Sequence, residues 1–118
     1  MDTSEIFANL KSILQPYEPP LSVVHNKSDH YYLNTPTTET NRKAEFFGAV
    51  QIKKSYVSYH LMPVYYYPEL LSDISPELRN RMQGKSCFNF KTKDDLLLTE
   101  LSSLTKTSFN KYKFLNKI

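Results

Sequence analysis

Residues 46–90 constrain the fold of this 118-residue chain most strongly, because strand-like segments follow one another there almost without a gap. Residues 43–52 and 55–62 are both rich in apolar and aromatic side chains, and only Lys53 and Lys54 separate them. Two strands with so short a connection form an antiparallel hairpin. The sequence therefore predicts an antiparallel sheet in this region.

The strand predicted at 55–62 carries large side chains on both of its faces. Alternate residues of a strand point to opposite sides. One side then carries Tyr56, Ser58, His60 and Met62, and the other carries Val57, Tyr59 and Leu61. This pattern indicates a central strand, or a strand whose second face is covered by a groove or a partner.

Helices are predicted near both ends of the chain. Apolar residues at helical spacing between Ile6 and Leu14 form one stripe, which Pro16 ends at about Gln15. A second apolar helix starts at about Leu96, after a capping segment at 92–95, with a break expected at 105–108. A shorter helix is expected from Ser75, as N-cap, to Met82, with Gly84 as its stop.

Further short strands are predicted at 21–24, 30–34 and 86–90. The expected fold is an α+β two-layer sandwich, with an antiparallel sheet of about five strands and the N- and C-terminal helices packed on one face. The chain has the length of one ordinary domain, so residues 1–118 are expected to form a single domain.

Composition excludes several classes of protein. Nine Tyr and seven Phe favour a sheet, whereas only two Gly disfavour the glycine-rich loops of nucleotide-binding enzymes. The single cysteine, Cys87, cannot form an internal disulfide, which suits a reducing cytosol. Residues 1–5 do not resemble a signal peptide, and no apolar run reaches the roughly 20 residues that cross a membrane. A cytoplasmic protein without a membrane partner is expected.

The net charge of +3 resides in the second half of the chain. Residues 1–59 carry 6 basic and 6 acidic side chains, and residues 60–118 carry 9 and 6. A nucleic-acid-binding domain usually shows a denser basic stripe, so nucleic acid is not an expected partner.

Three segments carry a family resemblance, at 56–71, 74–78 and 81–90. The first segment reads YVSYHLMPVY at 56–65 and PELL at 68–71. The second reads ISPEL, and the third reads RMQGKSCFNF. These segments resemble the YdhG-like family of small bacterial proteins of unknown function, and the similarity covers roughly residues 44–104. The resemblance implies a helix–sheet–helix sandwich similar in outline to frataxin. It also implies one candidate activity, because some members of the wider family are described as frataxin-like iron chaperones.

Iron binding of the frataxin type depends on many carboxylates on the first helix and the adjoining strand. This chain has only Asp2 and Glu5 on that helix, with Glu18 just beyond it, and it is net basic. A fold does not carry its function with it. No metal site is therefore predicted, and an intracellular iron-binding chaperone is kept as the alternative function.

No catalytic residue or cofactor site is predicted, although the question of enzymatic activity stays open. Cys87 and His60 are the only thiol–imidazole pair, but a free cysteine is more often a small buried hydrophobe. His25 and His30 lie on either side of a turn and could bind a divalent metal weakly, although exposed turn residues are the favoured interpretation. The segment at 84–86 lacks the first glycine of a phosphate-binding loop and is interpreted as a turn.

Tyrosines concentrated in or beside the predicted strands are the main functional signal. They either pack in the core or line a groove where their hydroxyl groups find partners. The predicted ligand-binding residues are Tyr56, His60, Met62, Tyr65, Lys85 and Cys87. The predicted function is a non-enzymatic binding domain for a small molecule or a protein, and both a monomer and a homodimer are compatible with the sequence.

Overall fold

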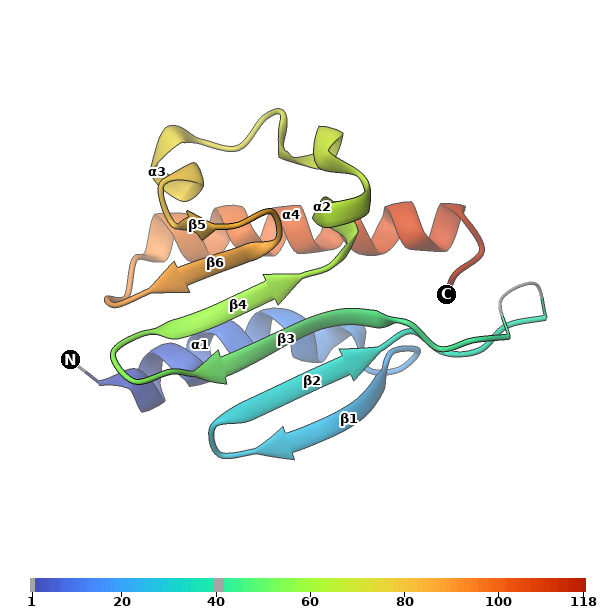
Figure 1. Cartoon of the computed structure of the whole chain (residues 1–118), viewed down its shortest axis with the longest axis horizontal. Helices are drawn as coiled ribbons and strands as arrows, with labels where there is room; N and C mark the ends of the chain where they lie inside the picture. Colours follow the sequence, from blue (N-terminus) through green and yellow to red (C-terminus); the bar gives the residue numbers. More distant parts are fainter. Residues whose placement is uncertain (1, 40–41) are drawn as a thin grey trace.

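Six strands form one open antiparallel sheet in the computed structural model, which describes residues 2–39 and 42–118 (Figure 1). They are β1 (Ser22–Lys27), β2 (His30–Asn34), β3 (Phe46–Ile52), β4 (Val57–Leu61), β5 (Met82–Gln83) and β6 (Cys87–Phe90). The strand order is β1-β2-β3-β4-β6-β5, and every neighbouring pair is antiparallel. The sheet thus has one strand more than the predicted five, and β4 is the central strand that its sequence predicts.

Two long helices lie behind this sheet, on the same face (Figure 1). The helical segments are α1 (Thr3–Leu14), η1 (Gln15–Tyr17), α2 (Pro63–Tyr66), η2 (Pro68–Leu71), α3 (Pro76–Arg79) and α4 (Asp95–Phe114). Helices α1 and α4 cover the sheet, whereas α2, η2 and α3 lie beside its β5–β6 edge (Figure 1). The predicted α+β architecture, with terminal helices on one face, is confirmed.

Helix α1 begins where Asp2 accepts hydrogen bonds from the backbone N–H groups of Ser4 and Glu5. Leu10 and Leu14 on its apolar stripe are fully buried against the sheet. The helix approaches β3 closely because Gly48 has no side chain. A Cβ at this position would lie 3.1 Å from the carbonyl oxygen of His60 and 3.3 Å from a methyl group of Leu14.

Helix α4 runs for 20 residues without interruption, so the predicted break at 105–108 is wrong. Asp94 caps its start by accepting a hydrogen bond from the N–H of Leu97. The hydroxyl groups of Thr105 and Ser108 donate to the helix carbonyl groups of Leu101 and Leu104. Polar side chains that bond within their own helix can be buried without ending it.

Helix α3 is shorter than predicted, because it ends at Arg79 and does not extend to Met82. Met82 and Gln83 instead pair with Phe88 and Cys87 and form β5. Backbone pairing with β6 replaces the helical hydrogen bonds that these residues would otherwise make.

The prediction that Met62 belongs to the preceding strand is also wrong. Strand β4 ends at Leu61, and Met62 is the N-cap of α2, which begins at Pro63. Proline is tolerated at the first position of a helix but cannot donate a hydrogen bond to a neighbouring strand. Met62 therefore lies at the junction between β4 and α2.

The core lies between the sheet and the helices. Fully buried aromatic residues fill it, namely Tyr31, Phe47, Tyr59, Phe88, Phe90 and Tyr112. Burial of the Tyr59 hydroxyl raises its pKa, although it lies 2.6 Å from the hydroxyl oxygen of Thr105 on α4. Within residues 2–39 and 42–118, no helix combines the length and the apolar character that crossing a bilayer requires.

Candidate functional site

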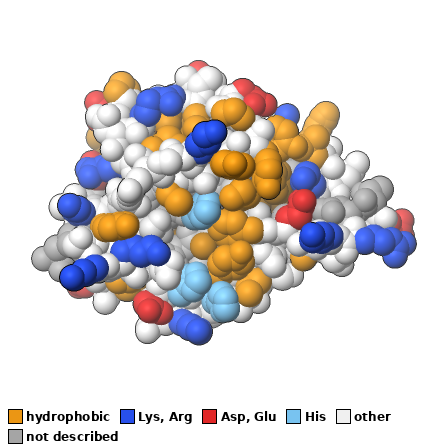
Figure 2. All heavy atoms as spheres, viewed as in Figure 1, with side chains coloured by type: hydrophobic (Ala, Val, Ile, Leu, Met, Phe, Trp, Pro, Cys, Tyr) orange, Lys and Arg blue, Asp and Glu red, His pale blue; other side chains and the backbone are white. Residues whose placement is uncertain are grey.

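The sheet face opposite α1 and α4 carries a hollow of about 550 Å³ in its centre. We call it the sheet-face hollow. Its apolar and aromatic lining consists of Tyr32, Phe46, Ala49, Tyr56 and Cys87. Its polar and basic lining consists of His30, Gln51, Lys53, Ser58, His60, Gln83 and Asn89. In Figure 2, this face shows apolar side chains bordered by histidines.

A continuous row of rings crosses this face from β1 to β4. The rings of His25 and His30 stack at a centroid distance of 5.0 Å, and each also contacts the ring of Tyr32. Tyr32 in turn stacks on Phe46 at 4.6 Å, and Phe46 meets the ring of His60 edge-on at 4.7 Å. Four neighbouring strands thus place five flat rings on one surface.

His60 is held in place at the end of this row. Its Nε2 atom lies 2.7 Å from the hydroxyl oxygen of Ser86, in the turn before β6. Burial lowers the pKa of His60 below its ordinary value of 6.5. Burial therefore favours the neutral ring, in which one nitrogen carries a proton and the other has a free lone pair.

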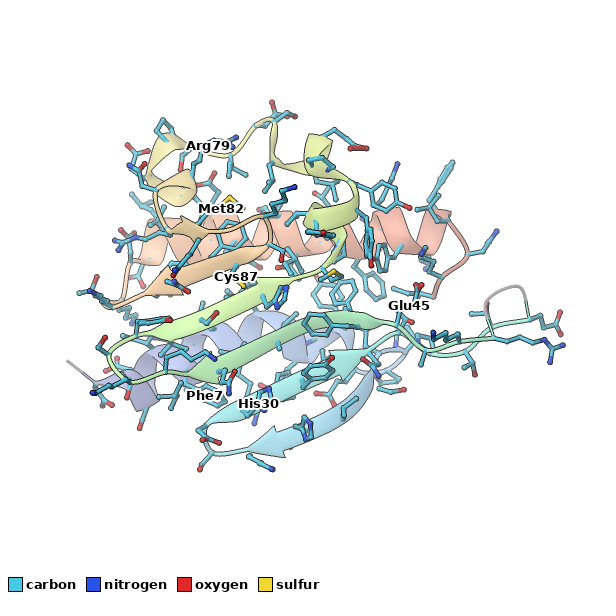
Figure 3. All side chains as sticks on the ribbon, in the orientation of Figure 1. Phe7, His30, Glu45, Arg79, Met82 and Cys87 are labelled. Atoms are coloured by element: carbon cyan, nitrogen blue, oxygen red, sulfur yellow. The ribbon has the colours of Figure 1, made fainter. Side chains whose placement is uncertain are left out.

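Strands β5 and β6 supply polar groups beside His60. Cys87 lies directly opposite His60 in the β4–β6 pairing, as its position on β6 in Figure 3 illustrates. Asn89 lies opposite Ser58, and its amide group donates a 2.6 Å hydrogen bond to the carboxamide oxygen of Gln83. The hollow therefore has rings on one side and carboxamide and hydroxyl groups on the other.

The charge of the lining is positive or neutral. No acidic residue is among those that line the sheet-face hollow, and Lys53 is its only lysine. The pKa of His30 is lowered, first by burial and second by the neighbouring His25, so His30 also favours the neutral form. The lining thus carries one lysine charge and no carboxylate charge.

Three of the six predicted ligand-binding residues meet in this hollow. Tyr56, His60 and Cys87 all line it. Tyr65 and Lys85 line a second hollow, beside the β5–β6 turn, where the ammonium group of Lys85 lies 6.0 Å from the centre of the Tyr65 ring. Met62 lines neither hollow. The structure therefore divides the predicted set between two places.

The tyrosines also divide between core and surface. Tyr31 and Tyr59 are fully buried on the helix side of the sheet, as core packing would require. Tyr32 and Tyr56 are partly exposed and line the sheet-face hollow. Core packing thus accounts for Tyr31 and Tyr59, whereas Tyr32 and Tyr56 lie at the surface of the hollow.

Several residues of the hollow are missing from the sequence-based set. Period-two alternation already places Asn89 on the same side of its strand as Cys87, so this residue could have been found. Phe46 could not, because a bulge in β3 determines on which face its side chain lies. A bulge is a local irregularity that alternation does not describe.

His25 and His30 form only a pair. Among the described residues, no group of three or more His, Cys, Asp or Glu side chains is placed to share one metal ion. The hydrogen bond that the structure gives His60 joins its Nε2 atom to the hydroxyl group of Ser86 and not to Cys87.

Comparisons with protein-family models, with curated proteins and with solved structures find no match for this chain.

Proposed function

We propose that this protein is a non-enzymatic binding domain whose sheet-face hollow binds a planar small molecule with a polar edge. The observation that carries the proposal is the row of rings on the uncovered face, which ends beside the carboxamide groups of β5 and β6. Kinship with the YdhG-like family is a proposal as well, and it rests on the sequence segments quoted above.

The ring row favours a flat ligand. Aromatic rings attract other flat rings by stacked and edge-on contacts, and each such contact contributes about 0.5–1.5 kcal/mol beyond the burial of apolar area. Tyr32, Phe46 and Tyr56 line the hollow and are only partly exposed, so their rings are already ordered by neighbouring side chains. A preordered surface loses little conformational entropy on binding.

The polar side favours a ligand with hydrogen-bonding atoms at its edge. Gln51, Ser58, Gln83 and Asn89 present both donors and acceptors, and Lys53 adds one positive charge. Small-molecule sites commonly have volumes of about 300–1,000 Å³ and combine apolar walls with a few polar groups. The volume of about 550 Å³ and the mixed lining agree with this description.

Binding of ferrous iron is the alternative function, and the contacts on this face give it less support. Iron prefers carboxylate and imidazole ligands gathered around one point. The lining of the sheet-face hollow has imidazoles but no carboxylate. Anaerobic calorimetry with ferrous iron tests the alternative directly, and an absence of binding tighter than about millimolar would remove it.

Binding of planar fragments can be followed by amide chemical shifts in an NMR titration. The probes are heteroaromatic carboxamides, such as nicotinamide, and the matched non-planar probe is cyclohexanecarboxamide. We expect the planar probes to bind more tightly and to shift the amide signals of Ala49, Ser58 and Cys87. Equal binding of flat and non-planar probes, or shifts confined to other surfaces, would contradict the proposal.

Two variants connect the binding to the hollow. Tyr32→Leu keeps the apolar volume but removes one ring, which should weaken binding about 2- to 10-fold, given about 0.5–1.5 kcal/mol per ring contact. Phe114→Leu is the matched control, because Phe114 is 73% exposed and does not line the hollow. An equal loss of affinity in both variants would locate the binding elsewhere. If the hollow binds a protein and none of the planar probes, its ligand is a protein and not a small molecule.

A further inference from the structure

The second hollow lies between the β5–β6 turn and the segments that precede it, and it has a volume of about 430 Å³. We call it the edge hollow. Its apolar lining comes from Val64 on α2, Pro68 and Leu71 on η2, and Met82 on β5. Arg79 and Met82, labelled in Figure 3, come from α3 and β5, away from the centre of the sheet face. The two hollows share none of their lining residues.

Two cationic side chains border this apolar surface. Arg79 donates a 2.8 Å hydrogen bond to the backbone carbonyl of Leu71, so one of its nitrogens is fixed beside the hollow. Lys85 follows Gly84, whose φ of 76° lies in the left-handed region that favours glycine. This turn places Lys85 beside Tyr65, with its ammonium group 6.0 Å from the ring centre.

Among the described residues, neither cation forms an ion pair with a carboxylate. In the described part of the chain, ion pairs within 4.0 Å join Lys93 to Asp95 and Lys117 to Glu45, and none involves Arg79 or Lys85. The lining of the edge hollow also contains no acidic residue. An apolar pocket with two positive charges and no negative one attracts a ligand that has an apolar body and an anionic end.

We propose that the edge hollow binds a small organic acid. Its carboxylate lies near Arg79 and Lys85, and its apolar body covers Val64, Leu71 and Met82. Val64 and Leu71 are 1% and 8% exposed, so they form a floor, while Tyr65 is 47% exposed and forms a side wall. This site is independent of the sheet-face hollow and of the function proposed for it.

The test is an NMR titration of the whole chain with 3-phenylpropanoate. The uncharged probe of matched shape is 3-phenylpropanamide. We expect the acid to shift the amide signals of Gly84 and Lys85, and to bind at least 5-fold more tightly than the amide. Shifts at Ala49 and Cys87 in place of these would assign the acid to the sheet-face hollow, and equal binding of acid and amide would overturn the proposal.

Charge variants supply the second measurement. Lys85→Gln should weaken binding of 3-phenylpropanoate about 3- to 10-fold and leave binding of the amide unchanged. Arg79→Lys, which keeps the charge, should retain more affinity than Arg79→Gln. Lys106→Gln is the control, because Lys106 is an exposed residue of α4 that does not line the edge hollow. Unchanged acid binding in Lys85→Gln would refute the role of this charge.

A peptide can present the same chemistry at its C-terminus. The peptide acetyl-Gly-Gly-Phe has a free carboxylate next to an aromatic side chain, so it serves as the third probe. Weaker binding of this peptide than of 3-phenylpropanoate is expected, because the hollow has the size of a small molecule. Tighter binding of the peptide would show that the site recognises a chain terminus instead.

Discussion

The buried hydrogen bond between Tyr59 and Thr105 joins the centre of the sheet to α4, and its direction follows from the structure. Thr105 has one hydroxyl proton, which it donates to the carbonyl of Leu101 at 2.8 Å. The contact of 2.6 Å between the two hydroxyl oxygens therefore has Tyr59 as donor and Thr105 as acceptor. Both side chains are fully buried, so neither group can exchange its partner for water without local opening.

This direction predicts unequal effects of the two single substitutions on the free energy of unfolding. Thr105→Val leaves the Tyr59 hydroxyl buried without an acceptor, which should cost about 2 kcal/mol. Tyr59→Phe removes the hydroxyl but leaves Thr105 bonded to Leu101, so the loss should be about 1 kcal/mol. The double variant replaces both partners by apolar groups of similar shape, and its loss should not exceed about 1 kcal/mol.

Urea denaturation followed by far-ultraviolet circular dichroism measures these differences. With a slope of about 2 kcal/mol per molar urea, Thr105→Val should lower the midpoint by about 1 M. The matched control is Tyr31→Phe, since Tyr31 is equally buried but its hydroxyl has no partner among the described residues. This control should be neutral or slightly stabilising. A double variant that loses the full sum, about 3 kcal/mol, would refute the reasoning, because coupled groups do not behave additively.

Three further predictions concern the helix ends and the pH dependence of stability. Asp94→Ala removes the acceptor for the Leu97 N–H at the start of α4 and should lower the free energy of unfolding by about 1 kcal/mol in urea titrations, with Asp94→Asn losing less. Glu100→Ala removes the carboxylate that accepts two hydrogen bonds of 2.6 Å, from the backbone N–H and the hydroxyl group of Ser75. The free energy of unfolding should fall by about 2 kcal/mol, and a change below about 0.5 kcal/mol would show that this contact is not formed. The pKa of His60 is lower in the folded chain than its ordinary value of 6.5. As the pH falls below about 6.5, the unfolded chain therefore binds more protons than the folded chain, and the free energy of unfolding should decrease. His60→Gln should reduce this decrease between pH 7 and pH 5, and an identical pH profile for both proteins would contradict the assignment.

Much of the secondary structure could be predicted because its signals are local. The alternation of apolar and polar positions from Val57 to Leu61 corresponds to β4, whose residues are alternately buried and partly buried. Asp2 and Asp94 cap the two long helices, as short polar residues before an apolar stripe predict. Two of the errors, at Met82 and at 105–108, arose where a long-range strand pairing or a bond within the helix outweighed the local preference.

The amino-acid sequence alone determined most of the strands and helices, because periodicity and capping act between residues that are close along the chain. It also determined that Ser58 and His60 lie on one face of β4, and that Val57, Tyr59 and Leu61 lie on the other. Only the tertiary structure decided which set is covered, since both long helices pack on the face that bears Tyr59. The order β4-β6-β5 then placed Cys87 opposite His60 and Asn89 opposite Ser58, through pairings between residues 27 and 31 positions apart that no local pattern specifies.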